Sequence, residues 1–326
     1  VAHPDYDGGD LDLGESGRSL TIQTFPHLPS LKGRTLITSD GTTILGADDK
    51  AGVAEILTMA EELLKGDIPH GQISIGFTPD EEVGRGADYF DVKGFGADFA
   101  YTVDGGREGE IEYENFNGAA ATITFTGVNI HPGSAKDTMV NAALVAMEFD
   151  SMLPKGQRPQ DTSGYEGFFH LTHMEGSVDK AVLSYIIRDH DEKEFEKRQE
   201  VMKKIGRELN KKYGEETVQV AIKESYRNMA EKIRPCFHLI ENAMEAVKRS
   251  GAVPNVVPIR GGTDGARLSY MGLPCPNLGT GGFSFHGPYE HITAEGMDIA
   301  VNTLLELAKI YSGIPSPSCA SAKRNE

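Results

Sequence analysis

Apolar and polar positions in the first third of the chain follow the pattern of an α/β domain. Between residues 47 and 64 apolar residues recur at helical spacing, which predicts an amphipathic helix that ends at Gly66. Short apolar runs predict strands in the segments 35–45, 72–78 and 99–103. This alternation of strands and helix favours a sheet that binds its ligands at the ends of its strands.

The middle of the chain has a different order of elements. Strand patterns occur at 119–126, 168–176, 182–188 and 217–223, and helical patterns occur at 140–152 and 191–213. The resulting order, β-α-β-β-α-β, predicts a ferredoxin-like α+β domain. Beyond residue 235 the chain returns to helical patterns at 235–249, 263–271 and 295–311, with a strand pattern at 254–259.

We therefore expect one α/β domain that is built from two segments of the chain, with a second domain inserted between them. The two segments are 1–109 and 225–313, the inserted domain is 110–224, and residues 314–326 form a flexible tail. The expected fold class is a mixed sheet flanked by helices, combined with an inserted ferredoxin-like α+β domain.

The composition excludes several classes of function. The 326 residues include 49 acidic and 32 basic side chains, a formal charge of −17, so the surface repels nucleic acid and anionic membranes. No run approaches 18 apolar residues, and the three cysteines form no C-x-x-C pair, so neither a membrane span nor a thiolate zinc site is expected. We expect a cytoplasmic protein whose acidic balance suits carboxylate ligands for divalent cations.

Acidic residues and a histidine stand beside glycines at the ends of the expected elements: Asp48, Asp49, Glu81, Glu82, Asp104 and His286. Each has an ordinary structural explanation when taken alone. Acids that open a helix cap it and interact with its dipole, acids after a proline are usually solvated, and an Asp before two glycines usually forms a turn. Taken together, carboxylates and an imidazole are the ligand set expected for zinc, and in particular for a hydrolytic site with two metal ions.

The positions of these residues indicate which of them can bind metal and which can transfer protons. A carboxylate that bridges two metals must come from a rigid element end, which the start of the helix at Asp48 provides. Glu81 and Glu82 are adjacent and cannot easily reach the same point. One of them can therefore bind metal while the other transfers protons as a general base and then as a general acid.

Six runs of sequence, taken in order, resemble the peptidase T family. They are L-G-A-D-D-K-A-G, F-T-P-D-E-E-V-G-R-G-A, Y-T-V-D-G-G, N-I-H-P-G-S-A-K, P-I-R-G-G-T-D-G-A and G-L-P-C-P-N-L-G-T-G-G, and the resemblance extends from about Gly8 to Ser312. This family contains cytoplasmic tripeptide aminopeptidases and belongs to the di-zinc metallopeptidases, with aminoacylase and succinyl-diaminopimelate desuccinylase. The resemblance implies a zinc-peptidase-type catalytic domain and a lid domain through which two copies form a homodimer.

The resemblance also implies roles for the residues at the matching positions. Asp48 would bridge two zinc ions. Glu82 and His286 would complete one metal site, and Asp104 would bind the other ion. Glu81 would be the catalytic glutamate, which takes a proton from the attacking water and returns it to the departing amine.

Two further residues match positions that contact the substrate in the family. His131 would reach the active site of the dimer partner and help to stabilise the tetrahedral oxyanion. Arg260 would bind the free C-terminal carboxylate of a short peptide, a task suited to a bidentate guanidinium. Alternatively, His131 is a turn residue of the lid and Arg260 forms a structural ion pair.

One part of the family pattern has no counterpart. The family has an H-x-D motif at the end of a buried upstream strand, which supplies another histidine ligand. His3-Pro4-Asp5 has the right spelling, but no apolar strand precedes it. The resemblance therefore implies that the family's N-terminal segment is missing here, which would leave an apolar face uncovered. One metal site would then be complete and the other would bind zinc weakly.

The activity implied by the resemblance is hydrolysis of the first peptide bond of tripeptides. One alternative is the same chemistry on another bond, as in the related dipeptidases, carboxypeptidases and N-acyl amino acid hydrolases. Another is a non-catalytic metal-binding homologue, because the H-x-D motif is absent.

Overall fold

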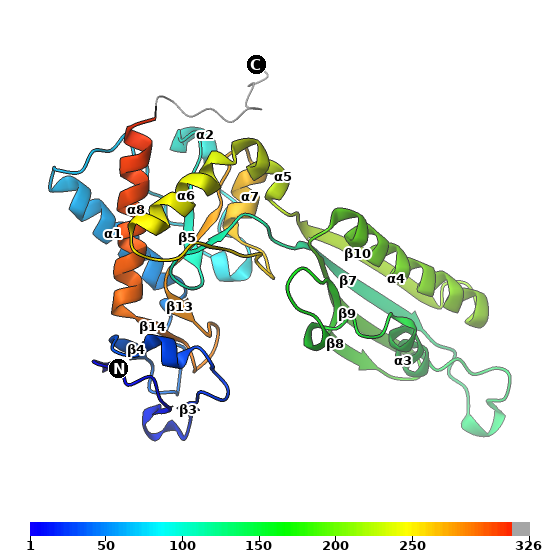
Figure 1. The fold of residues 1–326 in the computed structure, drawn as a ribbon. Helices are drawn as coiled ribbons and strands as arrows, with labels where there is room; N and C mark the ends of the chain where they lie inside the picture. Colours follow the sequence, from blue (N-terminus) through cyan, green and yellow to red (C-terminus); the bar gives the residue numbers. More distant parts are fainter. Residues whose placement is uncertain (315–326) are drawn as a thin grey trace, which may run out of the picture. The chain divides into compact units, whose positions relative to one another are not determined.

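The computed structural model describes residues 1–314, which form two compact units (Figure 1). Unit 1 comprises Val1–Tyr113, Met229–Val257 and the described residues from Thr263 on, and unit 2 comprises Glu114–Asn228 and Pro258–Gly262. The tail expected at 314–326 falls outside the described residues except for its first position. Within residues 1–314, no helix has both the length and the apolar character that spanning a bilayer requires.

Unit 2 has the ferredoxin-like order of elements that the sequence predicts. The four strands form one antiparallel sheet in the order β10-β7-β9-β8. Its elements are β7 (Asn117–Thr126), α3 (Ala142–Met152), β8 (Phe168–Gly176), β9 (Lys180–Asp189), α4 (Glu192–Tyr213) and β10 (Val218–Tyr226). The expected ferredoxin-like class is therefore confirmed.

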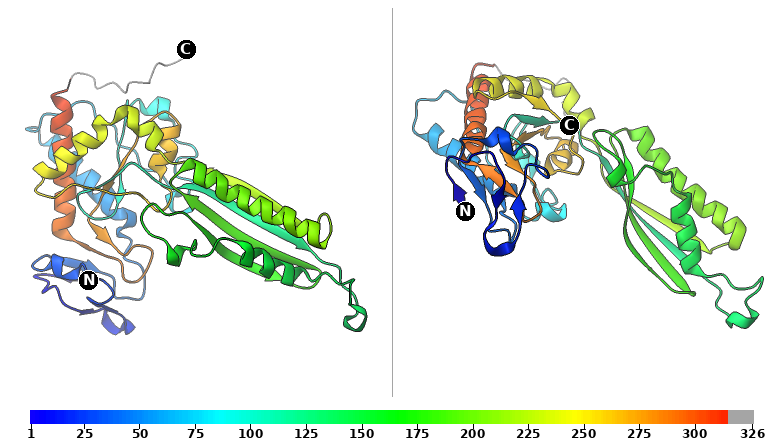
Figure 2. Two further views of the ribbon diagram at one scale, coloured as in Figure 1. Left: turned by 45° about the vertical axis from the view of Figure 1, so that its right-hand side comes forward. Right: turned by 60° about the horizontal axis from the view of Figure 1, so that its bottom comes forward.

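The core of unit 2 follows from alternation along its strands. Every second residue of β9 from Ala181 on is buried, and Leu183, Tyr185 and Ile187 point to the face that α3 and α4 cover. The right-hand view of Figure 2 shows both helices on the same side of the sheet. Phe149 of α3 is fully buried in this layer. Asparagine and aspartate side chains cap the two helices at Asn141 and Asp191.

Unit 1 contains two four-stranded sheets and a short hairpin. The sheets have the orders β1-β4-β14-β13 and β11-β6-β12-β5, and β2 pairs with β3. The strands are β1 (Ala2–His3), β2 (Leu11–Asp12), β3 (Ser19–Leu20), β4 (Leu36–Thr38), β5 (Thr102–Gly105), β6 (Glu110–Glu112), β11 (Asn255–Val256), β12 (Asn277–Gly279), β13 (Gly282–Phe283) and β14 (His291–Thr293). Parallel and antiparallel pairs occur together, so the expected mixed sheet is confirmed.

The helices of unit 1 are α1 (Ala47–Leu64), α2 (Val92–Phe95), α5 (Ala230–Ile233), α6 (His238–Arg249), α7 (Asp264–Tyr270) and α8 (Ala294–Ser312). Three of them pack together, because α8 contacts both α1 and α6. The predicted helices at 47–64 and 295–311 match α1 and α8 closely. The predicted helix at 235–249 is shorter in the structure, where a 3-10 turn, Arg234–Cys236, precedes α6.

Two strand predictions in unit 1 were wrong in detail. The segment 35–45 forms strand only at β4, which pairs with β1 and β14 from distant parts of the chain. The segment 72–78 forms no strand, and Ile75 within it is 40% exposed. A strand requires a partner for its backbone groups, and none of the described residues pairs with this segment.

The packing of unit 2 predicts a large loss of stability for Phe149→Ala. Its ring lies 5.7 Å from the ring of Phe125 and is fully enclosed, so truncation leaves a cavity and should lower the free energy of unfolding by about 3–5 kcal/mol. Met147 on the same helix is 58% exposed, and Met147→Ala should change it by less than about 0.5 kcal/mol. Chemical denaturation followed by circular dichroism measures both; equal effects would contradict the assigned core.

Candidate metal centre

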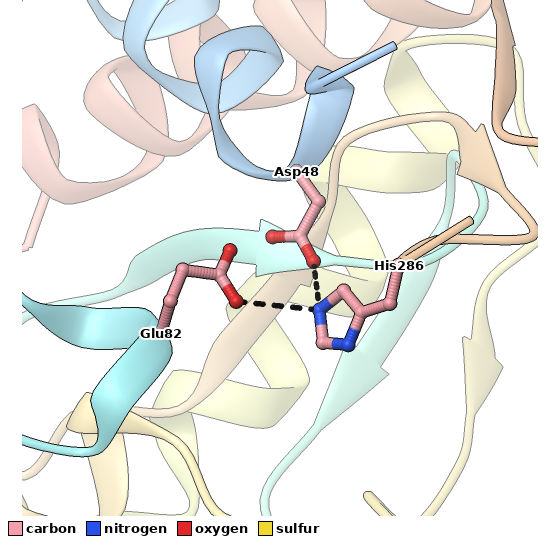
Figure 3. A group of neighbouring side chains, drawn as sticks. All are labelled: Asp48, Glu82 and His286. Carbon is pink, nitrogen blue, oxygen red and sulfur yellow. Dashed lines mark hydrogen bonds and ion pairs between the residues drawn. The ribbon is translucent and has the colours of Figure 1, made fainter. Parts of the chain in front are cut away.

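Three side chains from separate parts of unit 1 converge on one point (Figure 3). Asp48 lies at the start of α1, Glu82 in the 3-10 turn Glu81–Val83, and His286 in the loop after β13. The Nε2 atom of His286 is 2.8 Å from Oδ2 of Asp48 and 3.4 Å from Oε2 of Glu82. The three residues can therefore present their ligand atoms to one ion.

These distances fit a zinc ion. Zinc binds carboxylate oxygen and imidazole nitrogen at about 2.0–2.2 Å, so neighbouring ligand atoms of a tetrahedral site are about 3.3 Å apart. The ligand atoms of the group lie within 4.8 Å of one another, which requires only small side-chain rotations. Two carboxylates and one imidazole also leave a fourth position for water or substrate, as in catalytic zinc sites.

A second group of possible ligands shares Asp48 with the first. It consists of Asp48, Asp49 and Asp104, whose ligand atoms also lie within 4.8 Å of one another. Asp104 belongs to β5, and its backbone N–H donates a hydrogen bond to the side-chain oxygen of Asn277. Since Asp48 is common to both groups, it lies where a carboxylate that bridges two ions would have to be.

Gly52 allows the two elements that carry this second group to approach each other. A Cβ at Gly52 would lie 1.9 Å from the carbonyl oxygen of Val103, which is impossible for any other residue type without a backbone shift. The missing side chain therefore lets α1 pack directly on β5. This contact brings Asp48 and Asp49 next to Asp104.

The backbone at the start of α1 directs its two aspartates differently. Asp48 and Asp49 have non-helical dihedral angles, and Gly46 before them has a positive φ of 75°. The peptide bond between the two aspartates is cis. Oδ1 of Asp49 accepts a hydrogen bond from the backbone N–H of Gly52, whereas Oδ2 of Asp48 contacts His286.

Burial and neighbouring negative charges raise the pKa of two carboxyl groups of the second group, those of Asp49 and Asp104. Burial and the charge of Asp49 raise the pKa of Asp104 to about 9. Burial raises the pKa of Asp49 to about 8, and the charges of the neighbouring carboxylates contribute less to this rise. Groups that resist ionisation at neutral pH in this way are stabilised as anions by a divalent cation between them, so the donor set fits a metal.

Glu81 lies in the same field of negative charge. Burial, followed by the charges of Asp264 and Glu82, raises the pKa of Glu81 to about 7. Asp264 at the start of α7 is itself buried, and its Oδ2 has no hydrogen-bond partner among the described residues. A carboxylate with a pKa close to neutrality can both accept and donate a proton at physiological pH.

The two remaining predicted residues belong to unit 2. His131 is exposed, and its Nδ1 accepts a hydrogen bond from the backbone N–H of Gly133. The guanidinium of Arg260 donates to the carbonyl oxygen of Gly164 at 2.6 Å and to Oγ1 of Thr162 at 3.0 Å. It also lies 5.1 Å from the ring centroid of Phe116, so several groups hold it in one orientation.

Comparison with known proteins decides the family. Residues 113–217 match the family described as peptidase dimerisation domain. Over 308 residues the chain is 58% identical to peptidase T of Clostridium perfringens, a match that covers 94% of this chain and 76% of the relative. Peptidase T of Halothermothrix orenii is 54% identical over 309 residues, with the same coverage. The chain belongs to the peptidase T family.

Solved structures agree with this membership. A tripeptidase from Staphylococcus aureus superposes with a TM-score of 0.77 at 26% identity, covering 86% of this chain and 74% of that one. An aminopeptidase from Bacillus cereus superposes with a TM-score of 0.74 at 27% identity, covering 84% and 74%. A dinuclear metal-binding peptidase of Bacillus subtilis, at 18% identity and a TM-score of 0.58, shares the fold. The predicted combination of a peptidase catalytic domain with a dimerisation domain is thus confirmed.

Sequence reasoning overlooked two buried acids near this peptidase T centre, Asp264 and Glu290, and gave a third, the half-buried Asp49, no role of its own. Asp49 was named with Asp48 among the acidic candidates, and the structure shows that its side chain completes the second group. Asp264 follows Thr263 in the run G-G-T-D-G and resembled an ordinary helix start. Glu290 gave no signal, because Tyr289-Glu290-His291 matches no ligand pattern. The spelling H-x-D near the N-terminus proved unrelated, since His3 contacts Thr38 and belongs to neither group.

An apolar cavity of about 690 Å³ adjoins the candidate centre. Its walls come from the segment 71–78, from residues 96–104 with β5, and from the helices α1 and α8, while Asp49, Glu81 and Asp104 lie at its polar end. Among the described residues β5 pairs with β12 on one side and with no strand on the other.

Removal of the histidine ligand should remove the tighter metal site. In His286→Ala the group retains two carboxylates, so its zinc affinity, measured by chelator competition, should fall by at least about 100-fold. His70→Ala removes an exposed histidine outside both groups and should leave the affinity unchanged. Unchanged zinc affinity in His286→Ala would show that the metal binds elsewhere.

Glu55 in α1 makes the stability of the metal-free protein depend on pH. It is fully buried, neither of its carboxyl oxygens has a hydrogen-bond partner among the described residues, and burial raises its pKa from 4.5 to about 9. Between these values the unfolded chain has lost the proton that the folded protein still holds. Stability attributable to Glu55 therefore falls as pH rises, by up to about 1.4 kcal/mol per pH unit.

Glu55→Gln should remove this dependence. In buffer with a chelator, the free energy of unfolding of the variant minus that of the parent should increase steadily from pH 5.5 to 8.5. Glu61→Gln changes an exposed carboxylate on the same helix and should give a difference that is independent of pH. A pH-independent difference for Glu55→Gln would mean that Glu55 is ionised in the folded protein.

Proposed function

We propose that this chain is a metal-dependent aminopeptidase that releases the N-terminal residue from tripeptides. Membership of the peptidase T family makes it a peptidase. The observation that carries the proposal is the convergence of Asp48, Glu82 and His286 within ligand distance of one ion, with the pKa of Glu81 near 7 beside them. The related dipeptidase, carboxypeptidase, N-acyl amino acid hydrolase and non-catalytic alternatives are not favoured, because the curated relatives are named peptidase T.

The residues present would hold two zinc ions. Asp48, Glu82 and His286 form the more complete site, and Asp48, Asp49 and Asp104 form a site of carboxylates alone. Zinc supplies a Lewis acid, which polarises a carbonyl group and lowers the pKa of water towards neutrality. The carboxylate-only site lacks nitrogen ligands among the described residues and should bind zinc more weakly.

Glu81 would act as the general base and then as the general acid. Its carboxylate accepts the proton of the attacking water and later returns that proton to the nitrogen of the departing amine. The pKa of about 7 suits both transfers, because neither protonation state is strongly favoured at neutral pH. Asp264 would assist by its negative charge, which makes Glu81 a stronger base.

Arg260 and His131 would act on the peptide substrate. A substrate carboxylate would compete with the neutral carbonyl oxygens that Arg260 now contacts, and a charge-assisted bond is the stronger of the two. This contact would restrict the enzyme to short peptides with a free C-terminus. His131 would donate to the oxyanion in the active site of the partner in a homodimer, which the match to a dimerisation domain supports. A cytoplasmic location belongs to the same proposal.

Glu81→Gln should abolish turnover and spare metal binding. The amide cannot accept the proton, so kcat should fall by about 10²–10⁴-fold while the zinc content stays unchanged. Asp80→Asn is the matched control: Asp80 is exposed with a left-handed φ of 61°, which Asn tolerates, and activity should persist. Full activity of Glu81→Gln on a tripeptide would refute its role as the base.

A comparison of substrates tests the specificity. A tripeptide with a free C-terminus should be cleaved at its first bond, and the same tripeptide with a C-terminal amide should react far more slowly. Acylated amino acids should not react. Faster hydrolysis of the acylated amino acids would instead favour the N-acyl amino acid hydrolase alternative, and no turnover by zinc-loaded protein would favour a non-catalytic role.

A further inference from the structure

Glu290 is a buried carboxylate that binds the segment carrying Asp48. It is 1% exposed. Its Oε2 accepts a hydrogen bond from the backbone N–H of Gly46 at 2.6 Å, and its Oε1 accepts one from the backbone N–H of Asp48 at 3.0 Å. Both carboxylate oxygens are therefore engaged with two nearby backbone groups of one short segment.

These two N–H groups lack partners within the helix. The first N–H groups of any α-helix have no carbonyl four residues before them in the same helix. Here the start of α1 is also irregular, because Asp48 and Asp49 have non-helical dihedral angles, and the first helical bond runs from the N–H of Lys50 to the carbonyl of Gly46. The helix itself thus does not fix the backbone at Asp48, and Glu290 supplies this restraint.

Glu290 also belongs to the segment that supplies the histidine ligand. His286 lies four residues before it, and the backbone N–H of Glu290 bonds to the carbonyl of Gly287 at 3.1 Å, which closes the turn between them. β14 begins at the next residue and pairs with β4 and β13. Glu290 is therefore anchored to a sheet on one side and to the loop of His286 on the other.

We propose that Glu290 is a positioning residue of the metal centre, which fixes Asp48 relative to His286 by joining their two segments. This inference rests on the proposed function only in that it assumes a metal at Asp48, Glu82 and His286. The ligand atoms of Asp48 and His286 lie 2.8 Å apart, although 238 residues separate them in the chain. A connection by one rigid side chain keeps this distance with little conformational freedom, which lowers the cost of binding an ion.

The chemistry of the contact requires a carboxylate of this length. Glutamine has a single acceptor oxygen, so its amide nitrogen would face one of the two backbone N–H groups. Aspartate keeps both oxygens but is shorter by one methylene, and it cannot reach both N–H groups from the same backbone position. The two substitutions therefore weaken the contact in different ways.

The test compares Glu290→Gln and Glu290→Asp with the parent by two measurements. Amide hydrogen exchange of metal-free protein should become faster at Gly46 and Asp48, because their N–H groups lose an acceptor. The zinc affinity, from chelator competition, should fall by about 10–100-fold. Glu295→Gln is the matched control, since Glu295 also accepts a backbone N–H with both oxygens, from Thr35, and should alter neither measurement.

The outcomes separate this inference from the proposed function. Parental zinc affinity in Glu290→Gln, or an equal loss in Glu295→Gln, would overturn the positioning role. Unchanged exchange at Gly46 and Asp48 would overturn the contact itself. Failure of the parent protein to bind zinc would instead overturn the proposed metal centre. If Glu290→Gln does not fold, Glu290→Asp decides the question, because it keeps the charge and should give a smaller loss of the same sign.

Discussion

Mutual repulsion among partly buried carboxylates is the constraint on which the structure of unit 1 depends. Asp48, Asp49 and Asp104 are brought within a few ångströms of one another, and burial, followed by the charges of the neighbouring carboxylates, raises the pKa of Asp104 to about 9. Such an arrangement is unfavourable without a cation, so the surrounding structure must hold it in place. The close packing of α1 on β5 at Gly52 and the two hydrogen bonds to Glu290 provide that support.

The sequence predicted the elements whose pattern is local. The strands and helices of unit 2 were correct to within a few residues, because β9 alternates strictly and α4 is a long amphipathic helix with a capping Asp191. Unit 1 was harder to predict. β4 obtains its partners from the first residues and from β14, and no local signal at 35–45 reveals a partner more than 250 residues away.

The candidate site was predictable to the extent that its ligands lie in distinctive runs of sequence. Asp48, Glu82, Asp104 and His286 stand beside glycines and match a family pattern, and the structure brings them into two groups that share Asp48. Asp264 and Glu290 could not be predicted in the same way. Asp264 matters through its burial and its charge beside Glu81, and Glu290 through its burial and its bonds to backbone groups far along the chain. A single sequence does not encode these relations in any motif.

The edge of its sheet at which β5 lies bears on how the protein associates at high concentration. Residues of β5 line an apolar cavity, and no strand among residues 1–314 pairs with that edge, so the edge is open to pairing with another extended segment. The net charge of −17 keeps molecules apart but acts through the whole surface and is screened by salt. Self-association of the protein should therefore increase with ionic strength.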